Sequence, residues 1–381
     1  MKAYESARLS LADFRVRNRT VSGRKSRTDD AYVIATVLWY FRLRHRAGVN
    51  APYGLEALIE PKTIGKNRDG ERFHSSKWSR YRSGRTVPRT VLPAVEAMFP
   101  RANVLLTIPL WDALTARLLK QRQLEELVER LPRPVRWVVY DHLGEWRRGI
   151  EPLHQIDKRT AVALERRASL DALTAEILLL RLAHADGCSE SAFEWGRRVQ
   201  RMILLVYSEL IGGGIAQALI DLVNERIMPM ARHEGLQFGY PSGMYRQLIG
   251  VLTHALWHIR DRPYEDMEGT ERKLVAHQIL EGRYGYDLLY ALNPIRAAAE
   301  VSGVAAHEQF FATPDIWLFK WAHNMLTVGG HRLPPVLDVH TGKDLWATRQ
   351  GSLDPARHSP APEAQQSGSS KRSLPDEAAN S

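Results

Sequence analysis

The chain has 381 residues, of which 44% are hydrophobic and 25% are charged, and its formal net charge is +10. This is the composition of a soluble protein of two or three domains, and it excludes a fibrous protein and a chain that is disordered throughout. The single cysteine, Cys188, cannot form an internal disulfide bond, and the first residues lack the apolar stretch of a secretory signal. We therefore expect the protein in the reducing cytoplasm.

The positive charge is concentrated in the first quarter of the chain. Residues 1–101 hold 21 Lys and Arg against 9 Asp and Glu, a net charge of +12, whereas the rest of the chain carries −2. Such an asymmetry predicts a polyanionic partner for the basic part. Duplex DNA is favoured over a membrane surface because no amphipathic basic helix accompanies the charge.

The N-terminal residues 1–28 contain many arginines and few large apolar groups. This pattern predicts a flexible basic arm. In that arm, Arg15, Arg17 and Arg19 are expected to contact DNA phosphates or the minor groove.

A helix is predicted to follow the arm. It begins at Asp29 or Asp30, either of which is a suitable N-cap, and it ends at Gly48. Residues 61–76 are polar and contain glycines, so they are expected to form a loop.

Residues 77–90, KWSRYRSGRTVPRT, combine two aromatic residues with five basic ones. On a helix, Trp78 and Tyr81 share one face, and Gly84 ends the helix before Pro88. Such a helix, held by its aromatic face, suits contact with the major groove, because arginine bonds guanine in a bidentate manner and serines bond phosphate. The residues expected to contact DNA are Ser75, Ser76, Lys77, Ser79, Arg80, Arg82 and Arg85.

This stretch resembles the end of the Cro/CI-type (XRE-like) helix-turn-helix, in which a recognition helix is followed by a proline and a leucine-bearing helix. The resemblance covers residues 36–100 and implies a DNA-binding, helix-turn-helix-like module over residues 29–101. Two features differ from the family: about fifteen polar residues replace its tight turn, and Arg82 replaces its frequent glutamate. The alternative is a helical module that keeps the packing residues for another purpose.

Further along the chain, helical periodicity dominates. The pattern predicts a single helix over residues 112–131, a strand over 135–140 and a helix from Ser169 to Gly187. The apolar residues 202–223 are interrupted by three glycines and contain acidic groups, which favours two buried helices that meet at a glycine turn over a membrane span. Further helices are predicted over about 190–211, 215–231, 242–260, 270–283, 285–300 and 315–327.

The fold class expected from these patterns is mainly α. Residues 102–348 are expected to form an α-helical domain that dimerises or senses a partner. Residues 349–381 are rich in Ser, Pro and charge, which predicts a disordered tail.

One group of side chains offers metal ligands at helical spacing. His254 and His258 are one turn apart, as are His277 and Glu281. The glutamate of the H-E-x-x-H zinc-hydrolase motif is absent, and two buried histidines bonded to the backbone together with a surface His–Glu pair are the favoured explanation of the spacing. No metal, other cofactor or catalytic residue is therefore assigned.

The sequence leaves three functions open. The favoured one is a cytoplasmic, bacterial DNA-binding protein that regulates transcription and can form a homodimer, and a regulator is favoured over an enzyme. The second is a metal-dependent helical enzyme or effector that acts on nucleic acid. The third is a non-catalytic interaction protein of a bacterial defence or mobile-element system.

Overall fold

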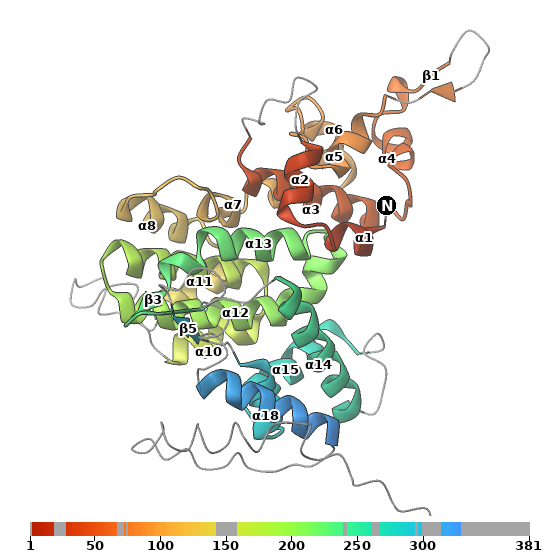
Figure 1. The fold of residues 1–381 in the computed structure, drawn as a ribbon. Coiled ribbons are helices and arrows are strands. Elements are labelled where there is room, and N and C mark those ends of the chain that lie inside the picture. The colour runs from red at the N-terminus through yellow and green to blue at the C-terminus, as the bar shows by residue number, and fades with distance from the viewer. Residues whose placement is uncertain are drawn as a thin grey trace, which may run out of the picture. The chain divides into compact units, whose positions relative to one another are not determined.

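The computed structural model describes residues 2–18, 28–66, 72–73, 75–141, 158–238, 242–260, 267–293, 296–298 and 314–328 (Figure 1). The chain divides into two units, residues 1–334 and 335–381, and every described residue belongs to the first unit. These residues are mostly helical, which confirms the mainly α prediction. The two domains expected on either side of residue 101 both fall within the first unit. The tail expected over 349–381 lies outside the described residues.

Two short helices occupy the start of the chain, α1 (Ala3–Ala7) and α2 (Leu11–Arg17). Ser10 caps α2 by accepting a hydrogen bond from the Asp13 backbone, and Leu11 and Phe14 are buried in the core. The flexible arm predicted here is therefore wrong for residues 2–18. The prediction missed that Leu11 and Phe14 suffice to hold α2 when a larger core lies beside it.

Helix α3 (Asp30–Arg46) begins and ends where the sequence indicated. The Asp29 carboxylate accepts a hydrogen bond from the Ala31 backbone, and Gly48 adopts a positive φ of 65° just beyond the helix. Side chains are buried on almost every face of α3, among them Trp39 and Phe41. This helix is thus the centre on which the surrounding elements pack.

Residues 52–106 form short elements beside α3. The segment between α4 and α5 contains an antiparallel hairpin in which Gly65 lies opposite Phe73, so part of the loop predicted there is regular structure. The elements are α4 (Pro52–Ile59), η1 (Pro61–Thr63), β1 (Gly65–Lys66), β2 (Arg72–Phe73), α5 (Lys77–Arg82), α6 (Leu92–Met98) and η2 (Ala102–Leu106).

The structure corrects two predictions in the next segment. The single helix expected over 112–131 is divided into α7 (Pro109–Ala113) and α8 (Gln121–Glu129), and Leu118 between them is 82% exposed. The strand expected over 135–140 lies in α9 (Arg133–Asp141). Val135, Val138 and Val139 are buried while Trp137 is exposed, a burial period that fits a helix and not a strand.

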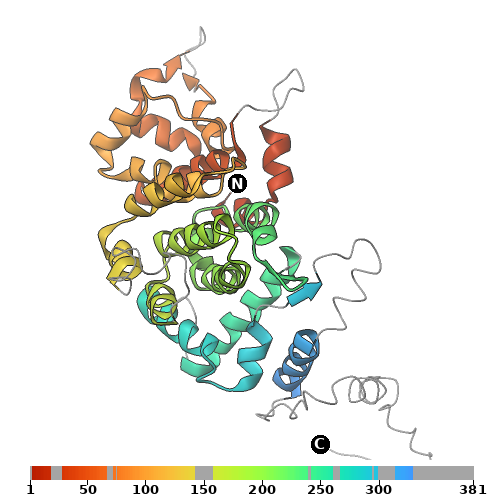
Figure 2. The same ribbon diagram turned by 90° about the vertical axis from the view of Figure 1, so that its left-hand side faces the viewer.

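Four helices follow: α10 (Lys158–Arg167), α11 (Leu170–Ala185), α12 (Ser189–Gly212) and α13 (Ala216–Arg226). Helices α11 and α12 lie side by side (Figure 2). Ser169 caps α11 by accepting a hydrogen bond from the Ala172 backbone, as its position predicted. Buried apolar residues cover α11 on all sides, because other helices contact it along its length.

A glycine turn joins α12 to α13, which confirms the prediction of two buried helices meeting there. A Cβ atom on Gly213 would lie 2.3 Å from Leu38 Cδ1, and one on Gly214 would lie 2.5 Å from Phe41 Cδ2. Both distances are far below van der Waals contact, so these glycines permit α3 to pack against the turn.

A small antiparallel sheet follows α13, and its first two strands are joined by the residues Glu234 and Gly235, both with positive φ. A two-residue turn with positive φ at both positions matches the right-handed twist of the two strands that it joins. The remaining elements are η4 (Met228–Met230), β3 (Arg232–His233), β4 (Leu236–Phe238), α14 (Ser242–Arg260), α15 (Gly269–Leu280), α16 (Tyr286–Leu292), β5 (Arg296–Ala298) and α18 (Pro314–Val328).

Within the described ranges, no helix has both the length and the apolar character that crossing a membrane requires.

Candidate nucleic-acid interface

Helix α5 is held against α3 by its two aromatic side chains. Trp78 and Tyr81 are both buried on one face, as their spacing predicted. The Trp78 ring is stacked on Trp39, with centroids 5.9 Å apart and planes 11° apart, and Tyr81 meets both indole rings edge-on. Such aromatic contacts contribute about 0.5–1.5 kcal/mol each beyond simple burial. They fix the rotation of α5 about its axis and turn its other face outward.

The start of α5 is bonded to two glutamates of the α4 segment. Glu56 Oε1 accepts hydrogen bonds from the Ser75 backbone at 3.1 Å and from its hydroxyl at 2.7 Å. Glu60 pairs with the Lys77 ammonium at 2.6 Å and accepts a bond from Trp78 Nε1 at 3.1 Å. Ser75 and Lys77, both assigned to DNA from the sequence, thus contribute to the packing of α5 on α4.

The end of α5 is equally constrained. Gly84 N donates to Tyr81 O, Arg85 N donates to Arg80 O, and Gly84 has a φ of 91°, which together form a Schellman-type ending. The side chain of Asn18, just after α2, donates to Ser83 O at 2.7 Å. Helix α5 is therefore fixed by α2, α3 and α4, although it has only six residues.

Several arginines follow one another along the chain from α5 into the turn beyond it. Arg80, Arg85 and Arg89 are exposed, Arg82 is half-buried, and none of their guanidinium groups pairs with a carboxylate in the part of the chain that the structure describes. The sequence from residue 72 to 95 contains no Asp or Glu. Lys77 in this segment pairs with Glu60, so the charge left without a carboxylate among the described residues is that of Arg80, Arg82, Arg85 and Arg89.

The other predicted DNA contacts differ in their surroundings. Arg15 is engaged by Asp30 and by Glu225, each at 2.8 Å, and these ion pairs join α2 to α3 and α13. Arg17 is exposed, and Arg19 lies outside the described residues. Ser76 is exposed and Ser79 is half-buried. The sequence reasoning did not single out Arg89, although its place after Pro88 in a segment without acidic residues was a usable signal.

The order of elements around α5 is helix α3, helix α4, a hairpin, and then α5. Helices α4 and α5 contact each other and both contact α3. In place of a tight turn, the connection between them contains η1 and the β1–β2 hairpin, which is visible at the top of Figure 1. The interpretation of this part as a helix-turn-helix stays a prediction.

The structure does not bring the four proposed metal ligands together. His254 and His258 are exposed neighbours on α14, with their Nε2 atoms 3.0 Å apart. His277 and Glu281 instead lie with Glu165, and one ligand atom of each falls within 4.8 Å of the others. These three residues form the best candidate for a metal site among the described residues.

Arginines occupy that candidate metal site. Glu165 is fully buried and is bonded by Arg198 at 3.0 Å and by Arg201 at 2.9 and 3.0 Å, while Arg201 also pairs with Glu281 at 2.8 Å. Two guanidinium groups already neutralise these carboxylates, and they would repel a metal cation. The cluster is therefore a buried ion-pair network, and it does not favour a metal-dependent enzyme.

Burial and charge set the ionisation of two glutamates here. Desolvation favours the neutral form of Glu165, but the contact with His277 and the charges of Arg201 and Arg198 outweigh it and lower its pKa to about 2. Glu176 on α11 is completely buried and its carboxyl oxygens have no hydrogen-bond partner among the described residues. Desolvation, assisted by the charge of Glu165, raises the pKa of Glu176 well above its ordinary value.

Comparison of the chain with protein families, with curated proteins and with solved structures finds no match. The function must therefore be argued from the residues of this chain.

Proposed function

We propose that the protein binds duplex DNA through the exposed side of α5 and the turn that follows it. Arg80 on α5 and Arg85 and Arg89 in the turn beyond it contact phosphates and base edges, and Ser79 precedes Arg80 on the same helix. The observation that carries the proposal is the run of arginines over residues 80–89 that have no carboxylate partner among the described residues and that begin on a firmly held helix.

Ion pairs elsewhere in the protein support the choice of Arg80, Arg85 and Arg89 as DNA contacts. Arg15, Arg130 and Arg226 each pair with acidic side chains. Clustered arginines without such partners repel one another, and a polyanion relieves that repulsion while releasing its own counterions. Arginine also offers a bidentate geometry that suits both phosphate and guanine.

The rigidity of α5 also supports the proposal. A recognition element loses less conformational entropy on binding when it is already held in place. Here Trp78, Glu60 and Gly84 fix the two ends and one face of the helix, which leaves the arginine side chains as the main groups to be ordered. The regulation of transcription and the formation of a homodimer remain extensions of this proposal that rest on the sequence alone.

The test compares wild-type protein with an Arg80→Ala/Arg85→Ala variant on random duplex DNA over a range of salt concentrations. The dependence of log K on log [salt] should be steep for the wild type, and its slope should fall by about 2 in the variant, since each phosphate contact contributes about 0.9. At low salt the variant should bind at least about tenfold more weakly, the effect of losing about 1.4 kcal/mol.

A matched control removes two exposed arginines from other parts of the fold, Arg117 and Arg166. The Arg117→Ala/Arg166→Ala variant has the same net charge as the test variant, so a general charge effect would weaken both equally. Salt-insensitive binding by the wild type, or equal losses in the two variants, would contradict the proposal.

A further inference from the structure

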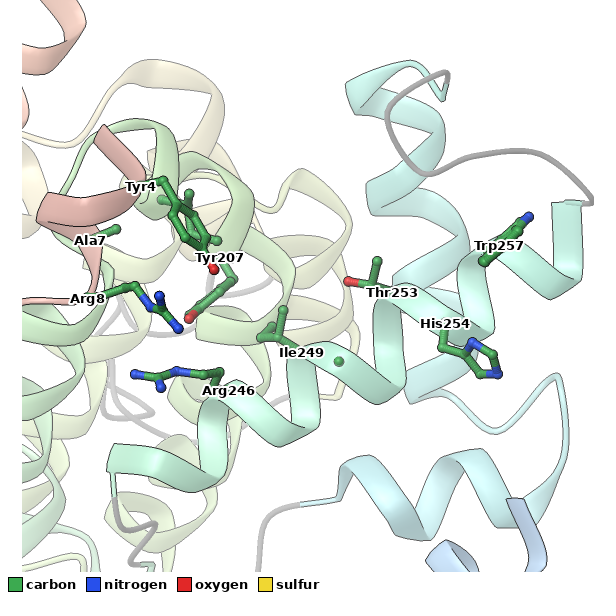
Figure 3. A pocket seen from close by; sticks show the side chains of 11 residues that line it. Tyr4, Ala7, Arg8, Tyr207, Arg246, Ile249, Thr253, His254 and Trp257 are labelled. Carbon is green, nitrogen blue, oxygen red and sulfur yellow. The ribbon is translucent and has the colours of Figure 1, made fainter. Parts of the chain in front are cut away.

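A cavity of about 600 Å³ lies between α1, α12 and α14, remote in sequence from α5 (Figure 3). Ligand pockets for small organic molecules commonly have volumes of about 300–1,000 Å³. None of the residues proposed to contact DNA lines this cavity, so DNA binding does not explain it.

The walls of the cavity are mainly apolar and aromatic. Ala7, Ile211 and Ile249 lie along it, and Tyr4 and Trp257 stand at its edges with exposed fractions of 56% and 53%. Exposed aromatic rings beside a concave apolar surface are typical of a site that a ligand covers.

One end of the cavity is positively charged. Figure 3 shows the side chains of Arg8 and Arg246 extending toward each other from α1 and α14, close to the hydroxyl of Tyr207. The Arg8 guanidinium lies 5.2 Å from the centre of the Tyr4 ring. No Asp or Glu is among the lining residues, and neither arginine has an ion-pair partner among the residues that the structure describes.

The Tyr207 hydroxyl lies at this charged end of the cavity (Figure 3). Burial raises the pKa of the Tyr207 hydroxyl, and the neighbouring charges of Arg246 and Arg8 act in the opposite direction. The two guanidinium groups therefore direct their positive potential into the same end of the cavity. An anionic group placed there would meet two donors of the kind that bind carboxylate and phosphate strongly.

We infer that this cavity binds an organic anion with an apolar body. Its carboxylate or phosphate lies between Arg8 and Arg246, and its aromatic or acyl part extends along Ile249 toward Trp257. The two kinds of headgroup share this chemistry, and the experiment below distinguishes them. The inference does not depend on DNA binding, because the pocket and α5 share no residue.

The experiment measures binding to the full-length protein with the fluorescent aromatic sulfonate 1-anilinonaphthalene-8-sulfonate as the probe. Decanoate, decyl phosphate and the uncharged decanol, which share one alkyl chain, then compete for the site. We expect one probe molecule per chain, with displacement by decanoate or decyl phosphate at concentrations at least tenfold below those needed with decanol. The better of the two anions identifies the headgroup.

Two variants test whether the probe binds in this cavity. Arg8→Ala/Arg246→Ala should raise the dissociation constant at least tenfold. Gly250→Leu should block binding sterically, because Gly250 lines the cavity and a Cβ atom added there meets no atom within 4 Å. Leucine is also a better helix former than glycine, so this variant should fold even if the double variant does not.

The Arg117→Ala/Arg166→Ala variant serves again as the charge-matched control and should bind the probe as the wild type does. Binding that survives both pocket variants would overturn the inference, because the probe would then sit elsewhere. Equal competition by decanol and decanoate would also overturn it, since the arginines would then contribute no recognition of an anion.

Discussion

Replacing Glu165 with glutamine should strongly destabilise the protein. The Glu165 carboxylate is fully buried and is the shared partner of Arg198 and Arg201. Glutamine has nearly the same shape but no charge, so the variant leaves both guanidinium groups without their common counter-ion. Only Glu281 would then remain to neutralise Arg201.

The pKa shift of Glu165 and the measured cost of breaking buried ion pairs correspond to a similar loss of stability. A pKa of about 2, against an ordinary value of 4.5, corresponds to about 3 kcal/mol at about 1.4 kcal/mol per pKa unit. Removal of one partner from a buried ion pair costs about 3–5 kcal/mol in measured cases. We therefore expect the free energy of unfolding to fall by about 3 kcal/mol at pH 7.

The pH dependence has a definite sign. Because the pKa of Glu165 is lower in the folded protein than in the unfolded chain, its stabilisation is complete above about pH 4.5 and is lost as the pH falls toward 2. Glutamine does not titrate. The difference between wild type and Glu165→Gln should therefore shrink by roughly 2 kcal/mol between pH 7 and pH 3.

Urea unfolding followed by circular dichroism at pH 7, 5, 4 and 3 measures this difference. The control is Glu126→Gln, because Glu126 forms an exposed ion pair with Arg122 on α8 and should contribute less than about 1 kcal/mol. A loss below 1 kcal/mol for Glu165→Gln, or a difference that stays constant down to pH 3, would refute the reasoning.

Three further substitutions, one of them a control, test other parts of the fold by the same unfolding measurement. Gly84→Ala places a Cβ atom 2.5 Å from Val33 Cγ1 at a φ of 91° and should lower the free energy of unfolding by about 2–4 kcal/mol. The control Gly187→Ala, at a φ of 73° with no atom within 4 Å of the new Cβ, should lower it by about 1–2 kcal/mol. Equal losses in the two variants would show that α5 does not pack closely on α3. Glu176→Met removes a buried carboxyl group without partners and should stabilise the protein by about 1–3 kcal/mol. Because the pKa of Glu176 is raised in the folded protein, the stability of the wild type falls as the pH rises above about 4.5. The stability advantage of Glu176→Met should therefore grow between pH 4 and pH 7. A difference that does not change with pH would count against a buried neutral carboxyl group at Glu176.

Local signals in the sequence were sufficient for many helix boundaries. Asp29 and Ser169 cap the helices that they were expected to cap, and Gly48 and Gly187 adopt positive φ where the helices end. Each of these features depends on the backbone groups of a few neighbouring residues, so a short stretch of sequence contains all the necessary information.

Two incorrect element predictions share another cause. The β-branched residues of α9 favour a strand in isolation, but their burial at Val135, Val138 and Val139 follows a helical period set by the neighbouring helices. The apolar stripe over 112–131 suggested a single helix, yet the chain turns near Leu118 to bring α8 onto α11. Packing against distant elements decided both cases.

For the candidate interface, the sequence by itself determined where the basic residues lie and which face of α5 carries Trp78 and Tyr81. Only the tertiary structure decided which basic side chains are left without partners. Arg15 meets Glu225, 210 positions later in the chain, and Lys77 meets Glu60 across the hairpin. Ion pairs between residues so far apart depend on how the helices pack, and no local pattern encodes that arrangement. Folding therefore left Arg80, Arg85 and Arg89 as the exposed arginines of this segment.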